Sequence, residues 1–387
     1  MRLPTPSATV LATITALFTL SSAHSDTQHG QYVLTDDLSY KNFFGSFDFF
    51  SGPDPTKGFV LYQNLTSAIS QKLIGYLQDT QSVFLGVDST NKDPNGRASV
   101  RLESKQAWNQ GLLVADIRHM PSPVCGSWPA FWLLGFDKDT GKSAWPLAGE
   151  VDIMEGVNDY EHNAVTLHTS KGCIVDNSTL HAAGHGETPF TGLLATDDCD
   201  VAAPGQGKNV GCSIKAPKTI TGIQTGSGAG SKETILPSYG TEFNKVGGGI
   251  YAMEWTSSAI SVWFFPRNSS AYTTHFGNTT TASTLDPSTW GVPVARFSGS
   301  GCNITERFQN LKIIFNTSYC GEWAGKEWDK SCAAKTGVDT CEAYVRDNPE
   351  AFKEVYWEIA GLKWFQRTTE PEQEPSSIKA KGRQYRW

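Results

Sequence analysis

The sequence has no runs of basic residues. Its 32 Lys and Arg are outnumbered by 39 Asp and Glu, which gives a formal net charge of −7. An acidic chain without basic clusters is a poor nucleic-acid binder, so we expect no nucleic-acid partner. The chain also lacks a second long apolar run and any internal repeat, and we expect no membrane span and no lipid anchor.

The single apolar run, residues 8–20, lies at the N-terminus. It follows the positive Arg2, precedes the small residues 21–23, and is too short for a comfortable membrane span. Residues 1–23 therefore read as a signal peptide cleaved after Ala23, which predicts a secreted, extracellular protein. The polar residues 366–387 form a tail that we expect to be disordered.

Cysteine is present in an even number, and none of the cysteines has the spacing of a zinc site. In an exported chain this predicts up to four disulfides, with 105 possible pairings. We favour only the local pair Cys332–Cys341. The eight cysteines are Cys125, Cys173, Cys199, Cys212, Cys302, Cys320, Cys332 and Cys341.

Asparagine sequons are numerous enough to predict some N-glycosylation of an exported protein. One of them adjoins a predicted strand at residues 311–315 and is the weakest acceptor, Asn316. The six sequons start at Asn64, Asn177, Asn268, Asn278, Asn303 and Asn316.

Three carboxylates lie within six residues, at Glu150, Asp152 and Glu155, among apolar neighbours that predict a strand. Alternate residues of a strand share a face, so Glu150 and Asp152 point the same way, whereas Glu155 has the opposite parity. A β-bulge near Ile153-Met154 would return Glu155 to that face. Glu150 and Glu155 would be roughly 13 Å apart along the strand. Leaning side chains could narrow this to about 5–6 Å, which suits a retaining glycosidase.

Each acid then has a predicted role. Glu150 attacks the sugar as nucleophile, and Glu155, with a raised pKa, is the general acid and later the base. Asp152 hydrogen-bonds to Glu150 and helps to keep the pair in opposite protonation states. The alternative is an acidic, solvated face of an edge strand.

The run from Glu150 to Glu155 resembles the E-x-D-x-x-E signature of family-16 glycoside hydrolases, in the form found in laminarinases and lichenases. The resemblance to secreted fungal laminarinases covers about residues 30–365, and the roles that it implies for the three acids are the ones given above. It extends to Asn42-Phe43-Phe44, residues 54–60, residues 111–132, Thr166-Leu167-His168-Thr169, Trp263-Phe264-Phe265-Pro266-Arg267 and residues 319–325.

The same resemblance implies sugar-binding roles for Trp132, Trp145 and Trp323. His168 is expected beside the catalytic strand, within reach of a catalytic carboxylate or the sugar. Trp128 and Trp263 are assigned nearer to the core. The family needs no redox cofactor and no catalytic metal, so we expect none. A structural calcium ion, known in relatives, cannot be derived from these residues.

Alternating apolar runs separated by turn residues predict an all-β protein. The resemblance makes it an antiparallel β-sandwich of jelly-roll type, with a cleft on the concave face. We expect one catalytic domain over residues 24–365, with long loops closed by disulfides over 179–238 and a helix starting near Pro349. The predicted strands are 82–87, 98–104, 112–118, 151–154, 164–169, 249–255, 259–265, 311–315 and 355–365.

These features predict a monomeric, retaining endo-β-glucanase acting on β-1,3 or mixed β-1,3/1,4 glucan. A transglycosylase would use the same residues, with a sugar hydroxyl replacing water in the second step. A non-catalytic β-glucan-recognition protein of the same fold is a third possibility, although such proteins typically lose the acids.

Overall fold

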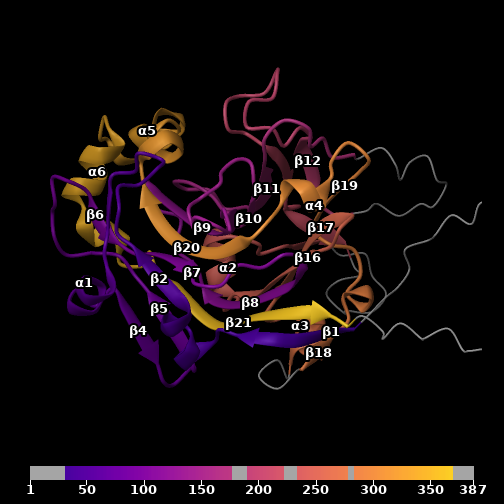
Figure 1. Cartoon of the computed structure of the whole chain (residues 1–387). Coiled ribbons are helices and arrows are strands. Elements are labelled where there is room, and N and C mark those ends of the chain that lie inside the picture. Colours follow the sequence, from indigo (N-terminus) through magenta and orange to yellow (C-terminus); the bar gives the residue numbers. More distant parts are fainter. Residues whose placement is uncertain (1–30, 177–189, 222–232, 278–282, 369–387) are drawn as a thin grey trace, which may run out of the picture.

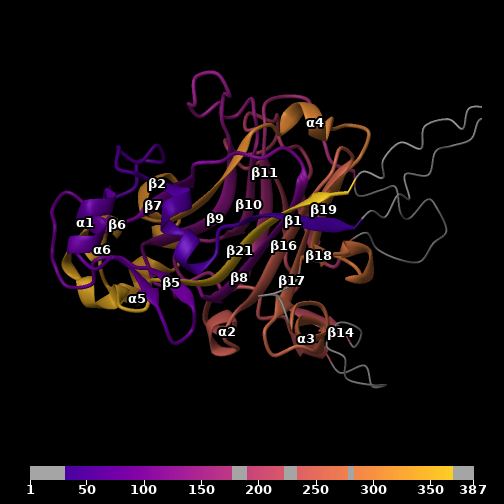
Figure 2. The same ribbon diagram turned by 60° about the horizontal axis from the view of Figure 1, so that its bottom comes forward.

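The structure is a computed structural model and describes residues 31–176, 190–221, 233–277 and 283–368. Two antiparallel sheets pack against each other (Figure 1). Turned by 60°, the molecule shows α2 and α3 beside the strands of one sheet (Figure 2). The β-sandwich predicted from the sequence is confirmed.

The larger sheet has nine strands, and its order begins at β18 and ends at β19, with β4 and β5 joined beside β21. Its strands are β18 (Thr284–Leu285), β1 (Tyr32–Asp37), β21 (Trp357–Arg367), β8 (Gly111–His119), β16 (Gly249–Trp255), β17 (Ala259–Pro266), β19 (Ala295–Ser298), β4 (Ile74–Leu77) and β5 (Ser82–Leu85).

The second sheet has eight strands and holds the acidic run in its interior. In spatial order its strands are β12 (Leu193–Thr196), β13 (Cys212–Lys215), β11 (Ala164–His168), β10 (Glu150–Glu155), β9 (Ser127–Gly135), β20 (Leu311–Tyr319), β7 (Arg101–Ser104) and β2 (Phe47–Phe50). Two small sheets pair β14 (Thr219–Thr221) with β15 (Glu233–Ile235), and β3 (Val60–Tyr62) with β6 (Arg97–Ser99).

Helices are short and lie in the connections. The α-helices are α1 (Leu65–Ser70), α2 (Gly240–Lys245), α3 (Ser270–Phe276), α4 (Ile304–Arg307), α5 (Cys332–Thr336) and α6 (Cys341–Asp347). The 3₁₀ turns are η1 (Tyr40–Asn42), η2 (Phe44–Ser46), η3 (Pro287–Thr289), η5 (Trp328–Lys330) and η6 (Pro349–Phe352), and η4 (Gly321–Gly325) is a π-helix. Within the described residues, no helix has both the length and the apolar character of a membrane span.

Strand alternation explains the core. Phe131 and Leu133 of β9 and Val151 of β10 face a main core that also receives Tyr251 and Met253 of β16. Ile250 and Ala252, which alternate with these residues on β16, belong to a second cluster on the other face of the larger sheet. That sheet is therefore covered on both faces, whereas the eight-stranded sheet is free to carry polar side chains on its outer face.

Each predicted strand finds a counterpart, with two differences. The run 98–104 divides into β6 and β7, which pair in different sheets, because the chain changes sheets at Val100. The last strand, β21, ends at Arg367, two residues beyond the predicted domain boundary. The helix predicted near Pro349 is the 3₁₀ turn η6, with proline in its first turn.

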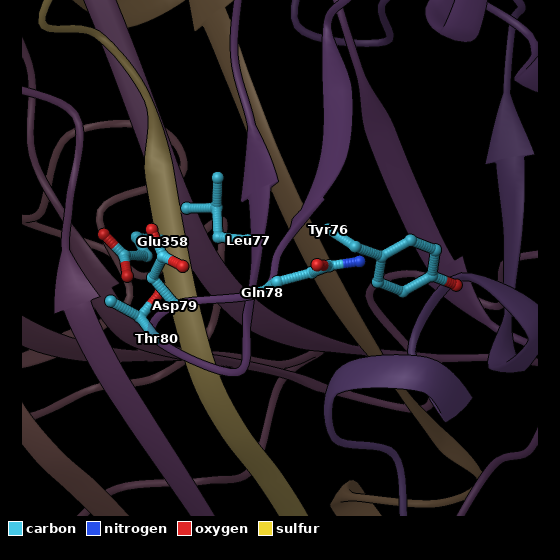
Figure 3. A pocket seen from close by; sticks show the side chains of 6 residues that line it. All are labelled: Tyr76, Leu77, Gln78, Asp79, Thr80 and Glu358. Atoms are coloured by element: carbon cyan, nitrogen blue, oxygen red, sulfur yellow. The ribbon is translucent and has the colours of Figure 1, made fainter.

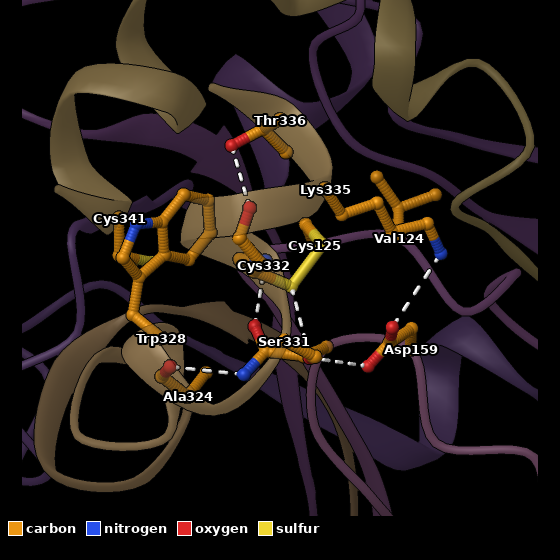
Figure 4. Close-up of a disulfide and its surroundings, with 12 residues drawn as sticks. Val124, Cys125, Asp159, Ala324, Trp328, Ser331, Cys332, Lys335, Thr336 and Cys341 are labelled. Atoms are coloured by element: carbon orange, nitrogen blue, oxygen red, sulfur yellow. Dashed lines mark hydrogen bonds and ion pairs between the residues drawn. A yellow bond between two sulfur atoms is a disulfide. The ribbon is translucent and has the colours of Figure 1, made fainter. Parts of the chain in front are cut away.

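Four disulfides join the eight cysteines, and the predicted Cys332–Cys341 pair is wrong. Cys332 bonds to Cys125 (Figure 4). Cys341 bonds to Cys320. The local pair fails because η4, α5 and α6 pack against one another beside β20, which brings Cys332 next to a cysteine 207 residues away and Cys341 next to one 21 residues away. The other pairs are Cys173–Cys302 and Cys199–Cys212. The latter lies in the region predicted as disulfide-closed loops, but that region also contains the strands β12, β13, β14 and β15, which the sequence did not predict.

Several predictions fall outside the described residues, namely the signal peptide, the sequons at Asn177 and Asn278, and the tail beyond residue 368. Three sequon asparagines are exposed: Asn64, Asn268 and Asn303. Asn316 is only 8 % exposed within β20, so its side chain is not presented as a glycan acceptor.

Candidate active site

The first two acids lie on β10 between β9 and β11. Glu150 is opposite His168 of β11, and Asp152 is opposite Trp132 of β9. Directly paired residues of antiparallel strands share a face, so these four side chains project from the same side of the sheet. The intervening Val151 is fully buried on the core side.

A β-bulge brings Glu155 to this face. The register between β10 and β9 shifts between Asp152 and Met154, after which Glu155 pairs with Ala130. Ala130 and Trp132 are alternate residues of β9 and therefore share a face. The three acids thus face one way despite the odd spacing of Glu155, which confirms the bulge predicted from the sequence.

Burial dominates the protonation of the three acids. It raises the pKa of Glu150, Asp152 and Glu155 to about 8 in each case. For the two glutamates this value includes the charge of Asp152, which raises the pKa, and that of the nearby His168, which lowers it. Three carboxyls so close together cannot all be ionised at moderate pH, so the site holds protons that could serve as an acid.

Trp128 contacts the third acid directly. Its indole Nε1 donates a hydrogen bond to Glu155 Oε1 at 2.7 Å, which lowers the pKa of Glu155 against the effect of burial. The expectation that Trp128 belongs to the core is therefore wrong. Trp128 is two strand positions from Ala130 and four from Trp132 on β9, so alternation places all three on the same face. This alternation could have predicted the contact of Trp128 with the acids. Trp263, by contrast, is 7 % exposed in the second cluster, as predicted.

His168 contacts an acid, as predicted. Its Nε2 lies 3.2 Å from Oδ2 of Asp152, and both side chains are almost fully buried. The structure therefore links the histidine to the central acid of the three. In strand register, His168 is paired with a different acid, Glu150.

The same face continues across β20, β7 and β2 with residues that the sequence did not single out. Trp132 donates through Nε1 to Asn316 Oδ1 at 2.7 Å, and Asn316 donates to the hydroxyl of Tyr62. The guanidinium of Arg101 lies 4.8 Å from the ring centre of Phe50 and 5.1 Å from that of Trp132. Its charge lowers the pKa of Glu150, which places a cation near the first acid.

Trp323 joins the site through Trp128. The two rings meet edge to face with centroids 5.7 Å apart, and the ring of Tyr160 also packs against Trp323, with centroids 6.0 Å apart. Trp145 lies on the loop before β10 and is 40 % exposed. Within the described residues, no hydrogen bond connects the Trp145 side chain to the acids, so its predicted sugar-binding role stays a prediction.

Two further features are a cluster of possible metal ligands and a hollow on the surface. Ligand atoms of Glu150, Asp152 and His168 lie within 4.8 Å of one another, close enough to hold a metal ion. A shallow hollow outside the acidic face lies between the β4–β5 turn and β21 (Figure 3). It is lined by Tyr76, Leu77, Gln78, Asp79, Thr80 and Glu358 and includes none of the predicted site residues.

Curated relatives resemble the chain over most of its length. An endo-1,3(4)-β-glucanase of Arthroderma benhamiae is 42 % identical over 343 residues, covering 88 % of this chain and 66 % of the relative. The endo-1,3(4)-β-glucanase xgeA of Emericella nidulans is 37 % identical, covering 87 % and 47 % respectively. The chain thus spans less than two thirds of the length of these relatives.

Solved structures agree on the fold. Laminarinase 16A from Phanerochaete chrysosporium, with β-glucans in its donor and acceptor sites, superposes with a TM-score of 0.71 at 35 % identity, covering 87 % of this chain and all of that one. An elongating family-16 β-1,3-glucosyltransferase gives the same TM-score and coverage at 36 % identity. The model of the XgeA-like catalytic GH16 domain matches residues 47–365. With its acids on one sheet face and this match across most of its length, the chain belongs to glycoside hydrolase family 16.

Proposed function

We propose that this chain is a retaining endo-β-glucanase that hydrolyses β-1,3 or mixed β-1,3/1,4 glucan. The observation that carries the proposal is the bulged strand β10, which presents Glu150, Asp152 and Glu155 on one face. Two carboxyls on one strand face, close enough to influence each other's pKa, suit direct attack on the sugar. The similarity to fungal endo-1,3(4)-β-glucanases supports the same substrate class.

In the first step, an oxygen of ionised Glu150 attacks the anomeric carbon and forms a glycosyl–enzyme ester. Protonated Glu155 gives its proton to the departing glycosidic oxygen. Burial favours this protonated form of Glu155, and the hydrogen bond from Trp128 holds one of its oxygens in place. The charges of Arg101 and His168 favour the ionised form of Glu150, against the larger effect of burial, which raises its pKa.

In the second step, ionised Glu155 takes a proton from water, and the resulting oxygen attacks the same anomeric carbon. The bond to Glu150 breaks, and the β configuration is retained after two inversions. Protonated Asp152, whose pKa burial raises, donates a hydrogen bond to Glu150 as that carboxylate leaves. Trp132, Trp145 and Trp323 bind the sugar rings along the cleft.

A transglycosylase is the second candidate, because a structurally similar family member is an elongating β-1,3-glucosyltransferase. A sugar hydroxyl would replace water in the second step with no change of residues. We further propose one catalytic domain from residue 24 to the end of β21 at Arg367, and a secreted, monomeric protein glycosylated at exposed sequons. The four disulfides support an oxidising compartment.

Incubation with laminarin, lichenan and cellulose, followed by sizing of the products, tests the proposal. We expect laminarin to be cut into oligosaccharides and cellulose to remain intact. Cleavage of lichenan would show that mixed-linkage glucan is also a substrate. A labelled acceptor sugar separates the two candidates, since incorporation of label into longer products would favour the transglycosylase. Unchanged laminarin in the presence of folded enzyme would contradict both candidates.

A further inference from the structure

The bulge in β10 leaves part of its backbone without a strand partner. Pairing with β11 runs from Glu150 to Asp152 and then stops, whereas pairing with β9 continues to Glu155. The edge of β10 that faces β11 after Asp152 therefore lacks a neighbouring strand. Unpaired peptide groups in a buried place are costly, so the bulge needs another partner there.

The carboxamide of Asn163 is that partner. Its Nδ2 donates to the carbonyl oxygen of Ile153 at 2.8 Å, and its Oδ1 accepts from the backbone N–H of Glu155 at 3.1 Å. A carbonyl only accepts and an N–H only donates, so these two partners fix the orientation of the amide. Asn163 is 1 % exposed and directly precedes β11.

This pair of bonds imitates a strand. On one edge of a β-strand, the carbonyl of one residue and the N–H two residues later face the same side, and a single antiparallel neighbour satisfies both. Asn163 satisfies them with its side chain. Its own backbone is held by two other segments, through a hydrogen bond from Ala216 N at 2.9 Å and one to Ser238 Oγ at 3.4 Å.

We propose that Asn163 is a positioning residue that locks the bulge and thereby holds Glu155 on the face of Glu150. Without the bulge, a one-residue change of register would turn Glu155 toward the core. Glu150 lies in regular pairing on both sides and does not depend on this contact. The proposal rests on the general-acid role of Glu155 proposed above.

The test compares two substrates in Asn163→Leu, which keeps the branched outline of the side chain but removes both hydrogen bonds. Laminarin needs a proton from Glu155, whereas a dinitrophenyl β-laminaribioside has a leaving group that needs little protonation. We expect kcat on laminarin to fall about 100-fold, as for a misplaced catalytic group. The rate constant for the first step on the aryl glycoside, measured by release of dinitrophenol, should fall far less.

Asn244→Ala is the matched control. Its carboxamide also bridges a backbone N–H and carbonyl, those of Met120, at 2.9 Å each, but it lies on α2 away from the acids. We expect this variant to leave the ratio of the two substrates unchanged. Equal losses on both substrates in Asn163→Leu, or no loss, would overturn the positioning role.

A second variant, Asn163→Asp, decides the question if Asn163→Leu does not fold. A protonated carboxyl offers one donor and one acceptor, as the amide does, whereas an ionised one offers no donor to Ile153. Activity on laminarin relative to wild type should therefore recover as the pH is lowered. A pH-independent ratio would overturn the inference. Wild-type hydrolysis of laminarin with β-products would leave the proposed function standing in either case.

Discussion

The two ends of β10 are built differently. Glu150 lies in regular antiparallel pairing, with Leu134 on one side and His168 on the other. Glu155 lies beyond a bulge, is paired with β9 alone, and is held by Asn163 at its backbone and Trp128 at its carboxylate. Glu150 is thus positioned by the sheet, and Glu155 by individual side chains, so the two residues should respond differently to mutation.

The largest effect should come from the regular end. Glu150→Gln is isosteric but cannot form the glycosyl–enzyme ester, so kcat should fall at least about a thousandfold. The measurement is laminarin turnover by a variant whose circular dichroism matches wild type. Near-normal turnover in that folded variant would remove Glu150 from the mechanism.

The irregular end should give a loss that depends on the leaving group. Glu155→Ala should reduce laminarin hydrolysis by about 100-fold or more, because protonation of the sugar oxygen is lost. An aryl glycoside with a good leaving group should be affected much less in its first step. Azide should restore turnover and yield the β-glycosyl azide, and equal losses on both substrates would disprove the acid role.

Tryptophans around the acids should affect binding more than folding. Trp145→Ala and Trp323→Ala should each lower kcat/KM on long glucans by about tenfold, roughly 1.4 kcal/mol. Their melting temperatures should change little, since both rings are at least partly exposed. Trp263→Ala is the control, because a buried ring costs about 3–5 kcal/mol of stability. A large fall in melting temperature with unaltered kinetics would assign Trp145 or Trp323 to the core.

The smallest effect concerns stability against pH. Folding raises the pKa of Glu155 from an ordinary 4.5 to about 8, so the folded state binds its proton more tightly than the unfolded chain. This contribution to stability is full below pH 4.5 and is lost as the pH rises toward 8. The amide of Glu155→Gln does not titrate, so the melting temperature of this variant should rise relative to that of wild type as the pH goes from 5 to 8. Parallel curves would contradict the raised pKa.

The acids on the regular strand could be predicted from the sequence, whereas some of the side chains that surround them could not. Alternation predicted β10 and the shared face of Glu150 and Asp152, and the parity of Glu155 required a bulge. Nothing local to Asn163 or Arg101 indicates their contacts, because these depend on which strands become neighbours. The disulfide partners of Cys332 and Cys341 were missed for the same reason, since neither cysteine bonds to its nearest neighbour in sequence.

Proton NMR of the first products released from laminarin tests the central claim most directly. The claim is that the bulge brings Glu155 onto the face of Glu150, close enough for direct attack on the sugar. We predict that the β-anomer appears first and that the α-anomer follows only by mutarotation. Initial release of the α-anomer would contradict the account, since it requires water between two widely separated carboxylates.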